Sequence, residues 1–248
     1  MDEKYWDRMA ADYDGEIFSV LASDRNEVII SVIQQFGSSR AAACDFGCGV
    51  GKFLPVLAEN FRSVYAFDLS GELLAQARQN CKELHNVSFS KADLSKNKIK
   101  IPRVDFSLCV NVLIMPSPEI RVAVFNTITK HLRCGAHLVL VVPSLESALL
   151  SDYRLVQWNL KQGFSYDQAV SDLDSDSDVL LRQGLVEIDG VPTKHYLKEE
   201  LIAFLVDKPF EIASIEKVEY SWDTEFDSPP KWMKAPYPWD WLFVLKKT

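Results

Sequence analysis

The chain of 248 residues and 28.2 kDa is 48% hydrophobic and 25% charged, which is typical of a globular protein and excludes a disordered or fibrous one. Its 27 basic and 35 acidic residues give a net charge of −8 and a pI of about 5.1. An acidic surface repels phosphate backbones, so we expect no nucleic-acid partner.

The sequence also lacks the marks of a membrane or an oxidising compartment. No apolar run approaches the roughly 18–20 residues that cross a bilayer, and the charged opening MDEKYWDRMA has no apolar signal core. The 5 cysteines are odd in number and form no CxxC pair, which disfavours a zinc ribbon or a disulfide framework. We therefore predict a cytoplasmic protein with no membrane partner.

The first 144 residues alternate between short apolar runs and amphipathic segments. The 3.6-residue period predicts helices, and the short β-branched runs predict buried strands. Helices are expected over 27–36, 52–61, 71–84 and 118–132, and strands over 41–46, 63–70, 86–94, 104–115 and 134–144. This alternation is typical of a mostly parallel sheet with helices on both faces, an α/β doubly wound fold.

The remaining residues follow a different pattern. A helical or loop insertion is expected over 145–195, and a helix over 196–207. Strands are expected over 210–222 and 239–247, joined by a long proline-rich loop. Two successive strands joined by a loop predict an antiparallel pair at the edge of the sheet.

One motif carries chemical information. The run Asp45-Phe46-Gly47-Cys48-Gly49-Val50-Gly51 lies between a predicted strand and a predicted helix, where glycines let a ligand approach the backbone. The dinucleotide fingerprint GxGxxG would need glycine at 52, where this chain has Lys52. A carboxylate at 45 would also repel a pyrophosphate. Both features argue against a nicotinamide-dependent oxidoreductase and favour a cofactor that carries positive charge.

Four blocks together resemble the class I S-adenosylmethionine-dependent methyltransferases of the small-molecule type. They are DFGCGVG (45–51), AFDLS (66–70), KADL (91–94) and VDFSLCVNVL (104–113). The opening YWDRMAADYD (5–14) is similar to the N-terminal lid helix of that family. The resemblance implies a Rossmann-like methyltransferase fold: a seven-stranded, mostly parallel sheet whose last strand is antiparallel, with an insertion after strand five.

The resemblance also implies a domain plan and a cofactor. A single domain over 1–248 would comprise lid helices (1–40), a cofactor-binding core (41–144), an insertion that shapes the acceptor site (145–195), and a C-terminal helix with edge strands (196–248). The implied cofactor is S-adenosylmethionine, with S-adenosylhomocysteine as the product.

The family assigns a role to each matching residue. Gly47, Gly49 and Gly51 would line the methionine and ribose, with Asp45 near the cationic amino group. Asp68 would accept both ribose hydroxyls, and Leu69 would pack on the adenine ring. Asp93 would accept from the adenine amino group, and Leu94 would offer its backbone N–H to the ring. Asn111 would face the methionine end, and Tyr13 would contribute from the lid. Asp68 could instead cap the helix over 71–84, and Asp93 with Leu94 could form an ordinary turn.

The acceptor is less well defined by the sequence. His195 and Tyr196 are candidate catalytic residues, because they follow the insertion in a region that borders the acceptor pocket in this family. The Asn-Val-Leu-Ile run at 111–114 departs from the Asn/Asp-Pro-Pro-aromatic signature of nucleic-acid base methylation. The acidic segment 171–178 lacks the glycine and glutamate of a calcium loop, so we predict no metal. The activity expected is methyl transfer to a small molecule; the alternative is an inactive cofactor-binding module.

Overall fold

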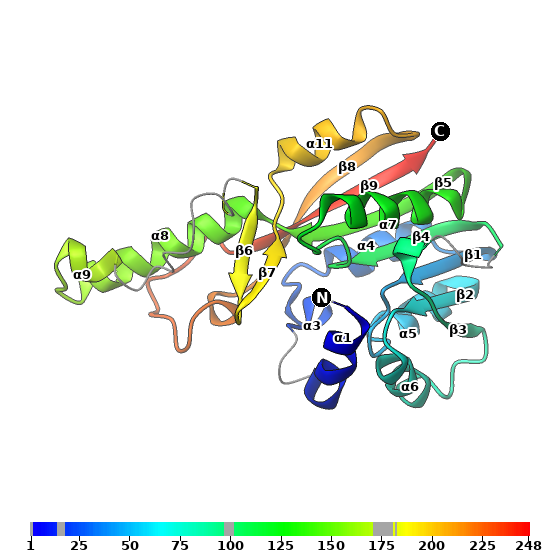
Figure 1. The fold of residues 1–248 in the computed structure, drawn as a ribbon, viewed down its shortest axis with the longest axis horizontal. Helices are drawn as coiled ribbons and strands as arrows, with labels where there is room; N and C mark the ends of the chain where they lie inside the picture. The colour runs from blue at the N-terminus through cyan, green and yellow to red at the C-terminus, as the bar shows by residue number, and fades with distance from the viewer. Residues whose placement is uncertain (1, 14–17, 97–101, 171–180, 182) are drawn as a thin grey trace.

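The computed structural model describes residues 2–13, 18–96, 102–170, 181 and 183–248, and its centre is a seven-stranded sheet (Figure 1). The strand order is β3-β2-β1-β4-β5-β9-β8. The strands are β1 (Ser38–Phe46), β2 (Phe61–Asp68), β3 (Val87–Lys91), β4 (Val104–Val110), β5 (Leu132–Pro143), β8 (Phe210–Glu219) and β9 (Trp239–Lys247). The first five are parallel, and β9 is antiparallel to both β5 and β8. The predicted fold class, with its reversed last strand, is confirmed.

Apolar residues cover both faces of the sheet because successive strand residues point to opposite sides. In β1, Ala43 belongs to one buried cluster and Cys44 to the other. The Ala43 side is covered by α4 (Val28–Phe36), α5 (Leu54–Asn60) and α6 (Gly71–Asn80). The Cys44 side is covered by α7 (Pro118–Lys130) and α11 (Lys198–Leu205). In this arrangement the carboxyl ends of all the parallel strands lie at the same edge of the sheet.

Before α4 and the sheet, the chain forms short helices. They are α1 (Glu3–Met9), the 3-10 turn η1 (Ala10–Asp12) and α3 (Val20–Ser23). β1 begins at Ser38, three residues before the start of the strand predicted over 41–46. The predicted helix over 71–84 is also shorter, since α6 ends at Asn80. The division of the chain into functional parts stays a prediction.

The insertion after β5 is partly helical, as expected. It contains α8 (Leu145–Lys161), α9 (Tyr166–Val170) and a hairpin of β6 (Leu185–Ile188) and β7 (Val191–Lys194), which we did not expect. In Figure 1, α8 continues from the end of β5 and extends away from the sheet, with α9 at its far end. The acidic segment 171–178 lies outside the described residues. Among the described helices, none has the length and apolarity needed to cross a membrane.

Candidate functional site

A cavity of about 1580 Å³ lies along the edge where the parallel strands end. Its wall combines residues that follow β1, β2, β4 and β5, the place where ligands bind in doubly wound sheets. Ten of the twelve predicted site residues line it: Tyr13, Asp45, Gly47, Gly49, Asp68, Leu69, Asp93, Leu94, Asn111 and His195. Gly51 and Tyr196 do not belong to the lining.

The glycine loop is held in a shape that only glycine adopts easily. Gly47 has φ +78°, and a methyl group there would overlap Cγ2 of Val112. The N–H groups of Gly47 and Cys48 both donate to the Phe67 carbonyl, at 2.7 and 2.9 Å. The loop is therefore fixed to the end of β2, with its backbone against the cavity.

Gly51 has a different task from the one that the resemblance implied. Its φ is +87°, and an added Cβ would meet Cys81 Sγ and Leu54 Cδ1, both at 3.1 Å. The glycine therefore lets the loop pack closely against α5 and α6, rather than lining the cofactor.

Asp68 is buried at the end of β2 and ties the loop together. Its Oδ2 accepts the N–H of Gly49 at 2.8 Å, and its Oδ1 accepts the N–H of Ser70 at 2.9 Å. Burial raises the pKa of Asp68, and these backbone bonds oppose the rise. Asp68 is not the cap of α6, because the Ser70 hydroxyl accepts the Leu73 N–H and fills that role. Each Asp68 oxygen keeps a lone pair that can accept a ligand hydroxyl.

Asp93 and Leu94 form a turn that also borders the cavity. Oδ1 of Asp93 accepts from Ser95, and Oδ2 pairs with Lys96 at 2.8 Å. Burial acts to raise the pKa of Asp93, but the ion pair and these hydrogen bonds outweigh it, so the pKa is lowered. Asp93 is thus an ionised acceptor at neutral pH, and buried Leu94 provides apolar surface beside it. The two readings of this segment, turn and adenine contact, are compatible.

Asp45 is the least satisfied acid in the site. It is 3% exposed, and none of the described residues gives its carboxylate a hydrogen bond or an ion pair. Burial, with the charge of Asp68 as the second cause, raises its pKa to about 7. A buried carboxylate without a partner is costly, and a cation in the cavity would relieve that cost.

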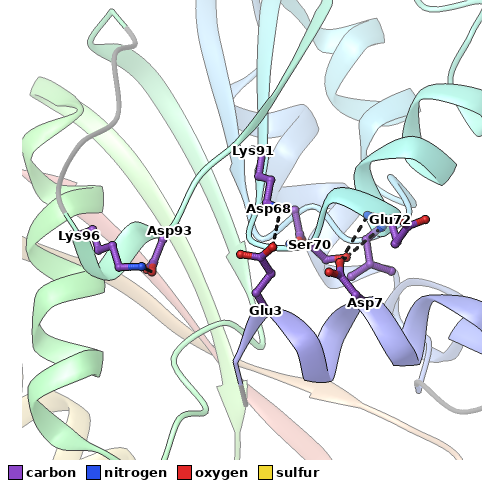
Figure 2. Close-up of polar contacts among 9 residues, drawn as sticks. Glu3, Asp7, Asp68, Ser70, Glu72, Lys91, Asp93 and Lys96 are labelled. Atoms are coloured by element: carbon purple, nitrogen blue, oxygen red, sulfur yellow. Dashed lines mark hydrogen bonds and ion pairs between the residues drawn. The ribbon is translucent and has the colours of Figure 1, made fainter.

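The N-terminal helix is held over the cavity by polar contacts (Figure 2). On α1, Glu3 points to Lys91 with an ion pair of 2.6 Å, and Asp7 accepts from the Ser70 hydroxyl. Farther along, the carbonyl of Ala10 accepts from Gln76 on α6. Tyr13 follows, and an added Cβ on Gly49 would lie 2.7 Å from its hydroxyl. The predicted lid segment therefore covers the glycine loop.

The two candidate catalytic residues are placed differently. His195 is buried in the cavity wall, with Nδ1 3.0 Å from the carbonyl oxygen of Thr193. A carbonyl can only accept, so Nδ1 carries the hydrogen and Nε2 holds the lone pair of the neutral ring. Burial is the main cause of its lowered pKa, which keeps the ring neutral at pH 7. His195 can therefore act as a proton acceptor.

Tyr196 does not fit a catalytic role in this structure. Its hydroxyl donates to the Leu113 carbonyl at 2.6 Å, away from the cavity lining, and burial raises its pKa. The phenol instead fixes the segment after β4 to the strand-like segment before α11.

Sequence reasoning missed a polar group at the far end of the cavity. Asp240 in β9 accepts the Tyr220 hydroxyl at 2.8 Å and the Asn111 side-chain amide at 3.2 Å, both at Oδ2. All three residues line the cavity. An acid within the apolar run WDWLFVL was the signal that could have found it, because a lone carboxylate in a buried strand needs a reason.

Comparison with known proteins finds one family match, over part of the chain. Residues 43–135 match the model of a family described as a methyltransferase domain. No curated protein matches the chain.

Solved structures share the fold at low sequence identity. One is the N-methyltransferase NodS from Bradyrhizobium japonicum WM9 in complex with S-adenosylhomocysteine (12% identity, TM-score 0.62, covering 99% of this chain and 97% of that one). Another is the magnesium protoporphyrin IX methyltransferase ChlM from Synechocystis PCC 6803 with bound S-adenosylhomocysteine (17% identity, TM-score 0.61, covering 99% of this chain and 98% of that one). The strand order and the glycine loop of this chain agree with the family match, which places a methyltransferase domain over residues 43–135.

Proposed function

We propose that this protein transfers a methyl group from S-adenosylmethionine to a small-molecule acceptor. The observation that carries the proposal is that one cavity brings Asp93, Asp68 and Asp45 together along the carboxyl edge of the sheet. These three carboxylates suit, respectively, an amino group on adenine, a pair of ribose hydroxyls and a cationic amine. The unpartnered, buried Asp45 in particular favours a positively charged ligand beside the glycine loop.

The residues of the chain would mainly bind, align and exclude water. S-adenosylmethionine, when bound, supplies a methyl group on a sulfonium that is already a good leaving group. Gly47 and Gly49 would let it approach the backbone, and Asp68 would accept the ribose hydroxyls. Alignment of this kind can supply most of the acceleration of an in-line displacement. His195, with a free Nε2 in the cavity wall, would take a proton from an acceptor that must lose one.

Three observations support a small-molecule acceptor and a cytoplasmic setting. The cavity wall includes residues of the N-terminal helices and of the β6–β7 hairpin, and its volume of about 1580 Å³ suits a small molecule beside the cofactor. Two structures that share the fold are named as an N-methyltransferase and a magnesium protoporphyrin IX methyltransferase. All five cysteines are unpaired, which suits a reducing compartment.

Calorimetric titration with S-adenosylmethionine tests the proposal. We expect the wild type to bind and Asp68→Ala to bind at least tenfold more weakly, because the variant loses the hydroxyl acceptor and the support of Gly49. Asp207→Ala is the matched control, since Asp207 is an exposed acid outside the cavity lining and should bind like the wild type. Absence of binding by the wild type would contradict the proposal. Binding without turnover of any small-molecule extract would favour the cofactor-binding module.

A further inference from the structure

We propose that the acceptor is an amine and that Asp240 binds it. This inference rests on the proposed function, because it names the acceptor class of the same cavity. Asp240 pairs with Pro143 at the carboxyl end of β5 and with Val218 in β8. Since β9 is antiparallel to β5, its first residues lie at the edge where the parallel strands end. The carboxylate therefore joins the far end of the cavity from Asp93, next to Asn111.

The hydrogen bonds of Asp240 leave one of its oxygens for a ligand. Both protein donors, the Tyr220 hydroxyl and the Asn111 amide, reach Oδ2. No described residue donates to Oδ1, although Asp240 is only 7% exposed and lines the cavity. Burial raises the pKa of Asp240 to about 6, and its two hydrogen bonds oppose the rise, so the group is mostly ionised at pH 7. An ionised carboxylate with a free oxygen needs a donor from the ligand.

The charge around the cavity favours a cation as that donor. Eight acids and three lysines belong to the described lining. The lysines lie toward the cofactor part: Lys4 on α1, Lys52 after the glycine loop, and Lys96 paired with Asp93. Glu225 lies close enough to Asp240 for its charge to act on it, and none of the three lysines of the described lining is among the groups whose charge shifts the pKa of Asp240. An anionic acceptor would be repelled there, whereas an ammonium group would be attracted.

Two further buried atoms of cavity-lining residues have no hydrogen bond to any described residue. They are Oδ1 of Asn111 and Nε1 of Trp239. Asn111 has φ +52°, a left-handed conformation that asparagine adopts more readily than most residues other than glycine. Its side-chain amide points to Asp240, to which it donates. The Asn111 oxygen, an acceptor next to the carboxylate, suits a ligand that donates hydrogen bonds rather than a purely apolar one.

The proton balance of the reaction is simple. Because Asp240 Oδ1 holds the ammonium group, the proton passes to this oxygen rather than to His195 and then on to water, which leaves a lone pair on nitrogen. The N–C bond then forms as the C–S bond breaks, and that electron pair stays on sulfur. The product is the methylated ammonium, and no oxidant or further reactant is needed.

Three matched probes test this inference on the protein saturated with S-adenosylhomocysteine. They are 2-phenylethylamine, 2-phenylethanol and 3-phenylpropionate, which carry a cation, a neutral hydroxyl and an anion on similar frames. By calorimetry we expect the amine to bind at least tenfold more tightly than the alcohol, and the propionate to give no binding. Asp240→Asn should reduce the preference for the amine at least tenfold. Asp223→Asn, an exposed acid outside the cavity lining, should leave it unchanged.

The outcomes separate the two proposals. Failure of the wild type to bind S-adenosylhomocysteine would count against the proposed function itself. If it binds but the alcohol or the propionate binds as tightly as the amine, or the amine does not bind, the amine inference is wrong. It is also wrong if folded Asp240→Asn, checked by its S-adenosylhomocysteine affinity, keeps the full preference for the amine. Because the wild-type probe series alone can refute the inference, it does not depend on that variant being stable.

Discussion

At the scale of single residues, Gly47 is subject to two constraints, a positive φ angle and a lack of space for a methyl group. Gly135 is subject only to the first. Gly47 and Gly135 have nearly the same backbone angle, φ +78° and +81°. A methyl group on Gly47 would overlap Val112, whereas a methyl group on Gly135 has nothing within 4 Å. Gly135→Ala should therefore cost only the conformational penalty of about 1–2 kcal/mol. Gly47→Ala should cost about 1–3 kcal/mol more, because it adds steric overlap.

Urea denaturation of both variants measures this difference. The free energies of unfolding can be compared directly if the m-values agree with that of the wild type. Equal losses would mean that Val112 moves aside freely and that only the backbone angle constrains the loop. Gly47→Ala should also weaken binding of S-adenosylmethionine, while Gly135→Ala, remote from the cavity lining, should not.

The residues of the site differ in how far the sequence could predict them. Asp45 and Asp68 end apolar strands, and a parallel sheet brings such ends to one edge, so pattern alone places them together. Asp240 begins a strand instead of ending one. It reaches the same edge only through its antiparallel register with Pro143. That register is a long-range property, which local periodicity does not contain.

At the scale of elements, the strands and helices of the core could be predicted because each carries a strong period. The hairpin of β6 and β7 was missed, although its turn has a local signal. Asp189 and Gly190 have φ +50° and +75°, the two left-handed residues that a tight hairpin turn requires, and Asp-Gly is a favoured pair there. Its strands have only four residues each and little alternation, so the flanking pattern was too weak.

The contact between α1 and α6 allows a prediction about the lid. Ser70 caps α6 through the Leu73 N–H and also donates to Asp7 on α1. Ser117 caps α7 in the same way, through the Ile120 N–H at 3.2 Å, without touching α1. Ser70→Ala and Ser117→Ala should each cost about 1 kcal/mol of stability, the usual value of a serine cap. Ser70→Ala alone should release α1 from the sheet.

Hydrogen exchange of the amides in residues 5–9 distinguishes the two variants. We expect several-fold faster exchange in Ser70→Ala and no change in Ser117→Ala, because only the first loses the Ser70 hydroxyl bond to Asp7 and keeps just the long Glu72 N–H contact at 3.5 Å. The exposed ion pair of Glu3 and Lys91 should not compensate, since such pairs contribute about 0–1 kcal/mol. Equal exchange in the two variants would show that α1 is held by its other contacts, the Gln76 bond to the Ala10 carbonyl and the apolar packing of Ala10 and Trp6.

At the scale of the whole molecule, the cavity runs across the full carboxyl edge and leaves Asp45 buried without a partner. Its pKa is about 7 in the folded chain, against an ordinary value of 3.8. Between these values the folded state binds more protons than the unfolded state, so this group makes stability fall as pH rises. Asp45→Asn removes the effect while leaving every other titrating group in place.

The free energy of unfolding of Asp45→Asn should therefore exceed that of the wild type by an amount that grows from pH 4 to pH 8. The increase is on the order of 4 kcal/mol, since each pKa unit corresponds to about 1.4 kcal/mol. Urea denaturation of both proteins at several pH values measures it, and a constant difference would show that Asp45 does not titrate in this range.

The same substitution should have the opposite effect on binding. Ionised Asp45 would face the amino group of the cofactor, so Asp45→Asn should bind S-adenosylmethionine at least tenfold more weakly at pH 8, with a smaller difference at pH 5. Saturating cofactor stabilises only the folded state, by an amount that depends on affinity. Adding S-adenosylmethionine at pH 8 should consequently raise the Tm of the wild type more than that of Asp45→Asn. If both rise equally, the unpaired charge of Asp45 is a cost that the cofactor does not relieve, and some other ligand must account for it.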